Sequence, residues 1–119
     1  MIKPVWIIDD DRSIRWVLEK ALARENIEYK SFVSADEALS ALQHETPQVV
    51  VSDIRMPGSS GLDLLQQLRE RHPHLPVIIM TAYGTTDTAI EATKLGAFDY
   101  VLKPFEVPEM LKIIGQALE

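Results

Sequence analysis

The sequence predicts an α/β domain in which a doubly wound parallel sheet of five strands is covered by helices on both faces. Short apolar runs alternate with amphipathic segments five times along the 119 residues, and the connections between them are short. Most of the apolar runs also stop abruptly at polar or charged residues, as strands do at the functional edge of an open sheet. With 46% hydrophobic residues, the chain can bury one core, so we expect residues 1–119 to form a single domain.

The first predicted strand is the short apolar run over residues 5–8. From Arg12 the apolar residues recur with the period of a helix, which predicts an amphipathic helix packed on the sheet. Residues 27–32 form the second predicted strand, in which Ile27 and Tyr29 alternate with charged neighbours. That alternation places Ile27 and Tyr29 on one face of the strand.

The next helix and strand lead to the centre of the sheet. Ser34 and Glu37 match a capping box, which predicts that a helix begins there. Pro47 then interrupts the chain before the β-branched run of residues 49–53. A run of this kind is typical of a strand buried on both faces, and it ends at Asp53.

The second half of the chain repeats the alternation. We expect strands over residues 76–80 and 98–102, and helices over residues 62–72, 85–94 and 107–118. The helix over residues 85–94 contains several β-branched threonines and is predicted to be marginal, with Gly96 as its C-terminal cap. A marginal helix is where a conformational change costs least, although a weak surface helix without a role would show the same pattern.

Composition excludes several classes of protein. The chain has 12 Lys and Arg against 18 Asp and Glu, and its net charge of −6 argues against direct contact with nucleic acid. It has no cysteine, and therefore neither a disulfide framework nor a thiolate site. We find no signal peptide and no apolar run of the ~20 residues that cross a membrane. These features predict a cytoplasmic domain.

Polar residues at four strand ends form the candidate site. They are Asp9, Asp10, Asp11, Asp53, Thr81 and Lys103. Parallel strands present such residues at one edge, where clustered carboxylates repel one another unless a cation neutralises them. Oxygen ligands without His or Cys favour Mg²⁺, with Mn²⁺ as an alternative, over zinc. Lys103 and Thr81 suit a phosphoryl group, which predicts that Asp53 is a nucleophile that becomes phosphorylated.

Simpler interpretations exist for some of these residues. The acidic triplet at residues 9–11 could merely cap the helix that follows it. We expect Trp6 and Trp16 to be packing residues, and we assign no role to the three histidines.

The chain resembles the receiver domain of two-component response regulators over essentially all of its length. The resemblance rests on Asp9-Asp10, on Asp53 with Met56-Pro57-Gly58 and Gly61, on Thr81-Ala82 and on Lys103-Pro104-Phe105. It implies a flavodoxin-like fold with strand order 2-1-3-4-5. Residues 14–18, 52–58 and 96–100 are most similar to NtrC-type nitrogen regulators, in which a central AAA+ ATPase and a helix-turn-helix domain follow the receiver. Residues 1–119 would then be the N-terminal part of a longer regulator.

The resemblance also implies a role for each matched acidic residue. Asp53 corresponds to the phosphoacceptor, which takes its phosphoryl group from a sensor histidine kinase. Asp10 corresponds to a direct Mg²⁺ ligand and Asp9 to one that acts through water. The backbone carbonyl of Arg55 completes the metal site, whereas the role of Asp11 stays open.

On the remaining strand ends, the resemblance assigns binding and switching roles. Lys103 contacts the phosphoryl group, and a cis peptide bond is expected between Lys103 and Pro104. Thr81 and Tyr100 correspond to the pair that switches on phosphorylation, and Tyr83 lies at a position that tunes the lifetime of the phosphoryl group. The expected output surface consists of the fourth helix, the fifth strand and the fifth helix, which would contact an output domain or a second copy in a homodimer.

Two alternatives compete with this assignment. A phosphohydrolase of the haloacid dehalogenase type also uses Asp and Mg²⁺, but it requires the nucleophile after the first strand and a second Asp two residues later, where this chain has Arg55. A pseudo-receiver would lack an acidic residue or the lysine, and all of them are present here. We therefore expect a regulatory phosphoacceptor that catalyses only its own phosphorylation and dephosphorylation.

Overall fold

The computed structural model describes residues 4–54, 61–81, 91, 94–103 and 105–118. The described strands are β1 (Val5–Ile8), β2 (Tyr29–Phe32), β3 (Val49–Asp53), β4 (Val77–Thr81) and β5 (Asp99–Leu102). The described helices are α1 (Arg12–Arg24), α2 (Ala35–Leu42), α3 (Gly61–Arg71) and α5 (Val107–Leu118). The predicted helix over residues 85–94 falls almost entirely outside the described residues.

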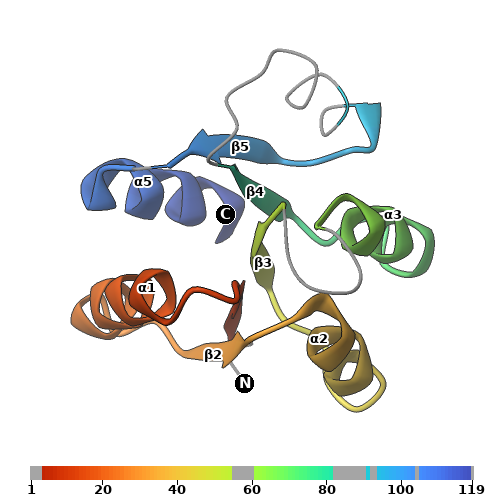
Figure 1. The fold of residues 1–119 in the computed structure, drawn as a ribbon, viewed down its shortest axis with the longest axis horizontal. Coiled ribbons are helices and arrows are strands. Elements are labelled where there is room, and N and C mark those ends of the chain that lie inside the picture. Colours follow the sequence, from red (N-terminus) through yellow and green to blue (C-terminus); the bar gives the residue numbers. More distant parts are fainter. Residues whose placement is uncertain (1–3, 55–60, 82–90, 92–93, 104, 119) are drawn as a thin grey trace.

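All five strands lie in one parallel sheet with the order β2-β1-β3-β4-β5, so the predicted fold class and strand order are confirmed. Figure 1 shows α1 and α5 against one face of this sheet and α2 and α3 against the other. Each face has its own hydrophobic cluster, one with side chains from α1 and α5 and the other with side chains from α2 and α3. The order places β3 at the centre, with β1 and β4 as its neighbours.

The central strand shows why the run before Asp53 is continuously apolar. Every residue of β3 is buried. Val49 and Val51 pack on the side of α1 and α5, whereas Val50 packs on the side of α2 and α3. Both faces of the strand therefore exclude water, and Asp53 is the residue at which the buried strand ends.

The second strand differs from its prediction. It begins at Tyr29 instead of Ile27, and Tyr29 is exposed, whereas Phe32 is the buried residue. Phe32 packs on Trp6 with 4.8 Å between the ring centroids. Because β2 is an edge strand, most of its side chains stay in solvent, and only the residue that faces the α2 and α3 cluster is buried. The predicted start of this strand was therefore two residues too early.

The two tryptophans behave differently. Trp6 is 1% exposed and belongs to the core, as expected, but Trp16 is 55% exposed. The expectation that Trp16 is a packing residue was therefore wrong. Its ring lies on the surface of α1 with Nζ of Lys20 4.4 Å from the ring centroid, so it is held by a cation–π contact instead of core packing.

The predicted cap of one helix is confirmed, whereas Gly96 follows a predicted helix that falls almost entirely outside the described residues. The hydroxyl oxygen of Ser34 accepts a hydrogen bond of 3.2 Å from the backbone N–H of Glu37 at the start of α2. Gly96 has a φ of +95°, a conformation that glycine adopts without strain.

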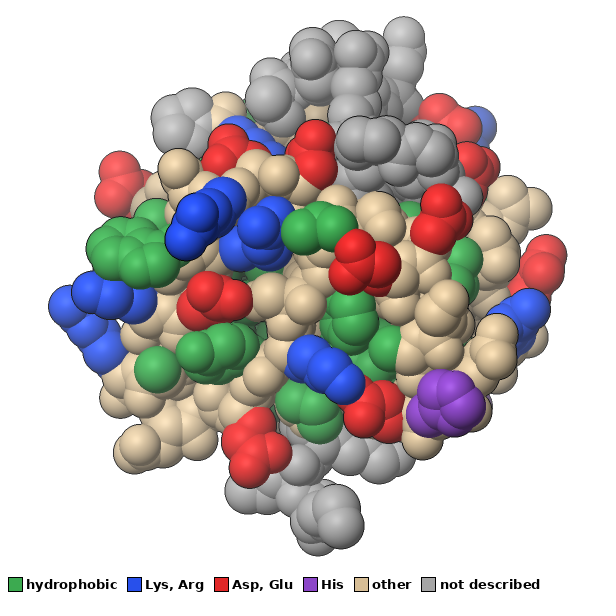
Figure 2. Space-filling model, turned by 60° about the horizontal axis from the view of Figure 1, so that its bottom comes forward, with side chains coloured by type: hydrophobic (Ala, Val, Ile, Leu, Met, Phe, Trp, Pro, Cys, Tyr) green, Lys and Arg blue, Asp and Glu red, His purple; other side chains and the backbone are tan. Residues whose placement is uncertain are grey.

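None of the described helices has the length and the apolar character required to cross a lipid bilayer. On the face drawn in Figure 2, acidic and basic side chains are interspersed.

Candidate functional site at the carboxyl edge of the sheet

The carboxyl ends of four strands bring the predicted polar residues to one edge of the sheet. Asp9 follows β1, Asp53 ends β3, Thr81 ends β4 and Lys103 follows β5. Backbone hydrogen bonds keep these ends aligned: the N–H of Lys103 donates to the carbonyl of Thr81 at 2.7 Å, and the N–H of Ile54 donates to the carbonyl of Met80 at 2.9 Å. The parallel sheet therefore assembles the site from segments that are far apart in the sequence.

Lys103 connects the two buried carboxylates. Its Nζ lies 2.7 Å from Oδ2 of Asp9 and 3.2 Å from Oδ1 of Asp53. Asp9 is fully buried, and Asp53 is 8% exposed. A buried carboxylate needs a partner, and one ammonium group supplies it to both.

Asp10 completes an acidic cluster with these two residues. One carboxylate oxygen each from Asp9, Asp10 and Asp53 lies within 4.8 Å of the others. In contrast to its two neighbours, the Asp10 side chain is exposed. Three carboxylates at this spacing can hold one metal ion, and their hard oxygen donors suit Mg²⁺ better than zinc. The residues present therefore fit the ion that the sequence predicts.

The third aspartate of the triplet has a different task. The Asp11 carboxylate accepts a hydrogen bond of 2.8 Å from the backbone N–H of Ser13 and is the N-cap of α1. The interpretation of the acidic triplet as a helix cap is therefore right for Asp11, to which the resemblance assigns no role. Asp9 and Asp10 belong to the acidic cluster instead.

The surroundings of Asp53 raise its pKa above the ordinary value for an aspartate. Burial is the largest cause, and the negative charge of Asp9 adds to it. Lys103 acts in the opposite direction through its charge and its hydrogen bond. Lys103 therefore favours the ionised form of Asp53, which is the form that can act as a nucleophile.

The pKa of Lys103 is also raised. Burial alone would lower it, but hydrogen bonds and charge interactions with Asp9 and Asp53 together outweigh the effect of burial. Lys103 is consequently a fixed positive charge at this edge of the sheet, next to the place where a phosphoryl group on Asp53 would lie.

Thr81 and Tyr100 lie on neighbouring strands. Thr81 is buried, and its register partner on β5 is Leu102. Tyr100 comes two residues before Leu102, so both tyrosine and threonine belong to the same face of the sheet. Tyr100 is 41% exposed and lies on β5, which is an edge strand of the sheet. Other assigned residues, namely Arg55, Tyr83 and Pro104, lie outside the described residues.

Arg15 is a residue of the site that the sequence did not reveal. Its Nη1 donates a hydrogen bond of 2.6 Å to the carbonyl oxygen of Asp9. Arg15 lies in the first turn of α1, where a charged residue is normally taken for part of the solvated face. Only its distance of six residues from Asp9, across the turn between β1 and α1, could have suggested the contact.

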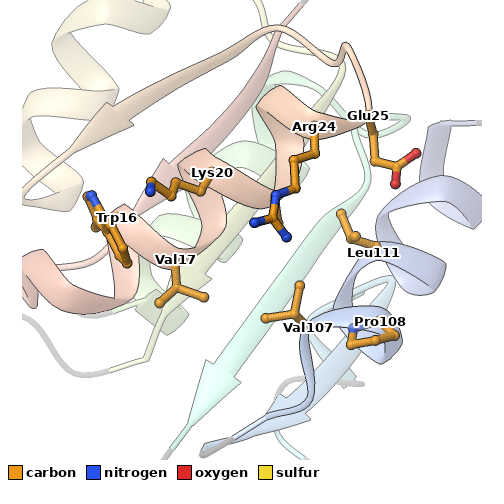
Figure 3. A pocket seen from close by; sticks show the side chains of 9 residues that line it. Trp16, Val17, Lys20, Arg24, Glu25, Val107, Pro108 and Leu111 are labelled. Atoms are coloured by element: carbon orange, nitrogen blue, oxygen red, sulfur yellow. The ribbon is translucent and has the colours of Figure 1, made fainter.

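A groove between α1 and α5 is separate from this site. It has a volume of about 430 Å³, and Trp16, Lys20 and Leu111 are among its lining residues. Figure 3 shows these side chains projecting from the two helices. Asp9, Asp10 and Asp53 do not line the groove, so it is not a part of the acidic cluster.

Comparison with known proteins bears on the whole chain. Residues 5–115 match the family described as the response regulator receiver domain. Over 114 residues, the chain is 52% identical to the DNA-binding transcriptional regulator NtrC of Salmonella typhimurium. The aligned residues make up 96% of this chain and 24% of that protein. The chain thus spans about a quarter of the length of that regulator.

Two solved structures of nitrogen regulatory protein C are also similar. The apo form of its receiver domain has a TM-score of 0.88 at 51% identity, covering 98% of this chain and 94% of that one. The BeF3-activated receiver domain has a TM-score of 0.84 at 50% identity, covering 99% of this chain and 95% of that one. Together with the acidic edge of the sheet, these matches show that the chain belongs to the response regulator receiver domain family and is of the NtrC type.

Proposed function

We propose that Asp53 accepts a phosphoryl group from a sensor histidine kinase and that the phosphorylated domain controls an output domain. One observation carries the proposal. Asp53 ends the central strand and belongs to the acidic cluster that could hold a metal ion, and Nζ of Lys103 lies 3.2 Å from its carboxylate. A nucleophile, a cation site and a fixed positive charge are the components that phosphoryl transfer requires.

In the proposed reaction, a carboxylate oxygen of Asp53 attacks the phosphorus of a phosphohistidine. The new O–P bond gives an acyl phosphate, and the P–N bond breaks so that the imidazole leaves with its electron pair. Lys103 binds a phosphoryl oxygen, and Asp9 holds Lys103 in place through the contact of 2.7 Å. Mg²⁺ or Mn²⁺ bound by the cluster of Asp9, Asp10 and Asp53 would neutralise the negative charge that gathers on the phosphoryl oxygens.

The expected response to phosphorylation involves Thr81 and Tyr100. In the proposed active state the Thr81 hydroxyl binds the phosphoryl group, and Tyr100 turns from its exposed position toward the space that Thr81 leaves. The placement of both residues on one face of the sheet, and the exposure of Tyr100, support this assignment. The phosphoryl group would then act by shifting a two-state equilibrium.

The partners follow from the same proposal. We infer that the chain is the N-terminal receiver of a longer cytoplasmic regulator with AAA+ ATPase and helix-turn-helix output domains, and that activated receivers can form a homodimer. The 52% identity to NtrC supports this inference. The receiver itself makes no direct contact with nucleic acid in this proposal. In this proposal the receiver catalyses only its own phosphorylation and dephosphorylation. The nucleophile and the residues that would hold the metal ion lie together in this one domain.

The proposal is tested with acetyl phosphate as the donor in the presence of Mg²⁺. Intact-mass spectrometry should detect one added phosphoryl group on the wild-type protein and none on Asp53→Asn, because an amide is not a nucleophile of this kind. Asp99→Asn is the matched control, since Asp99 begins β5 at the opposite edge of the sheet. Equal labelling of Asp53→Asn and the wild-type protein would refute the assignment.

A further inference from the structure

The contact between Arg15 and Asp9 joins α1 to the end of β1. The guanidinium of Arg15 donates from Nη1 to the Asp9 carbonyl oxygen over 2.6 Å, which is a short, charge-assisted hydrogen bond. The Arg15 side chain is only half-buried, and its backbone N–H is bonded to the carbonyl of Asp11 within the helix. The side chain thus reaches back from the first turn of the helix to the strand that precedes it.

The carbonyl that Arg15 binds lies just beyond the sheet. The register of β1 with β2 and with β3 ends at Ile8. The N–H of Asp9 still donates to the carbonyl of Phe32 at 3.1 Å, but the Asp9 carbonyl follows the last paired residue. In the part of the chain that the structure describes, the Arg15 guanidinium is the hydrogen-bond donor to this carbonyl.

The other polar groups of Asp9 are also fixed. Its Oδ1 accepts a hydrogen bond of 2.9 Å from the N–H of Asp11, and its Oδ2 contacts Lys103 at 2.7 Å. The bond from Arg15 holds the Asp9 carbonyl as well, and with it the peptide plane between Asp9 and Asp10. The orientation of that plane sets the direction in which the Asp10 side chain leaves the backbone.

Asp10 depends on this plane more than the other members of the cluster do. Asp9 and Asp53 are buried and contact Lys103. The Asp10 side chain, by contrast, is exposed and has no hydrogen-bond partner among the described residues. We therefore propose that Arg15 is a positioning residue of the metal site, which holds the Asp10 carboxylate toward Asp9 and Asp53. This inference rests on the proposed function, in which that cluster binds Mg²⁺.

A positioning role and a purely electrostatic role predict opposite results. The guanidinium is a positive charge close to a cation site, so removing its charge alone would make Mg²⁺ bind more tightly. Removing a residue that orients metal ligands weakens metal binding, commonly by a factor of 10–100. The direction of the change in Mg²⁺ affinity therefore distinguishes the two roles.

The test is a titration with MgCl2 that is followed by amide chemical shifts of the metal site. We expect Arg15→Gln to weaken Mg²⁺ binding about tenfold, near the lower limit for such residues. Phosphorylation by acetyl phosphate should fall at low Mg²⁺ and recover at saturating Mg²⁺, because the nucleophile is untouched. Arg12→Gln is the matched control, since Arg12 is exposed on the same turn of α1 and should leave the affinity within twofold of the wild type.

Each outcome decides the inference. A folded Arg15→Gln protein with unchanged or tighter Mg²⁺ binding would overturn it. If that variant does not fold, Arg15→Lys keeps the charge but loses the planar geometry, and a wild-type affinity for this variant would also overturn the inference. A wild-type protein that binds Mg²⁺ but takes up no phosphoryl group would refute the proposed function, while the affinities would still decide the role of Arg15.

Discussion

At the scale of single residues, the three consecutive aspartates after β1 have three different environments. Asp9 is buried and paired with Lys103, Asp10 is exposed in the acidic cluster, and Asp11 caps α1. Residue type is the same in all three cases, so the differences come from the backbone, which turns from strand to helix within these residues. The same turn brings Arg15 to the Asp9 carbonyl.

These environments predict how Mg²⁺ changes the stability of the protein. A ligand that binds only the folded state stabilises it by about 2.7 kcal/mol at a concentration one hundred times its dissociation constant. The wild-type protein should therefore unfold at a higher temperature in Mg²⁺ than in EDTA, and Asp10→Asn should lose most of that difference, as thermal unfolding followed by circular dichroism would measure.

Asp11→Asn is the matched control for this prediction. Asparagine is an equally good N-cap, and Asp11 is not a member of the acidic cluster. The Asp11 variant should keep the full stabilisation by Mg²⁺. Loss of the Mg²⁺ effect in both variants would mean that net negative charge, and not ligand geometry, binds the ion.

At the scale of elements, the sequence predicts the buried strands of the sheet more accurately than the edge strand β2. The continuous apolar runs of β1, β3 and β4 were predicted nearly residue by residue, because burial on both faces leaves little freedom in composition. The start of the edge strand β2 was predicted two residues too early, because only Phe32 of this strand is buried and no continuous apolar run marks its bounds. Trp16 was expected to be a packing residue but is exposed. The helical period does not show which residues beside the apolar face of a helix are buried.

The segment that leads into β5 provides a test of backbone geometry. Gly96 has a φ of +95°, and a Cβ at this position would lie 2.8 Å from Nε of Arg69. Adopting positive φ costs a residue with a side chain roughly 1–2 kcal/mol. We expect Gly96→Ala to lower the free energy of unfolding by at least about 1 kcal/mol in urea denaturation.

Gly115 is the control for the Gly96 variant. It lies in the interior of α5, and a Cβ there would meet nothing within 4 Å. Alanine is the better helix former, so Gly115→Ala should stabilise the protein by roughly 0.5–1 kcal/mol. If both variants changed stability in the same direction, the backbone conformation at Gly96 would not be the cause.

At the scale of the whole molecule, the topology made the site predictable from the sequence. Polar residues that end parallel strands must lie at one edge, so the proximity of Asp9, Asp53 and Lys103 followed once the alternation of strands and helices was recognised. The contact of Arg15 was not predictable in this way, because it depends on the path of one turn and not on the order of the strands. The roles assigned to Arg55, Tyr83 and Pro104 stay predictions.

Strands β4 and β5 connect the candidate site to the exposed residue Tyr100. Lys103 and Tyr100 belong to β5 or follow it directly, and the N–H of Lys103 is bonded to the carbonyl of Thr81. A group bound at Asp53 can therefore act on β4 and β5 together, and through them on the exposed edge at Tyr100. This continuity is the physical basis of the proposed switch.

The central claim is that Asp53 receives a phosphoryl group and passes its effect to Thr81 and Tyr100. Amide chemical shifts measured with Mg²⁺, before and after addition of beryllofluoride as the phosphoryl analogue, test it most directly. We predict large shifts at Asp53, Thr81, Lys103 and Tyr100 in the wild-type protein and none in Asp53→Asn. Shifts at Tyr100 that persist in Asp53→Asn, or wild-type shifts that stop at Asp53, would contradict the account.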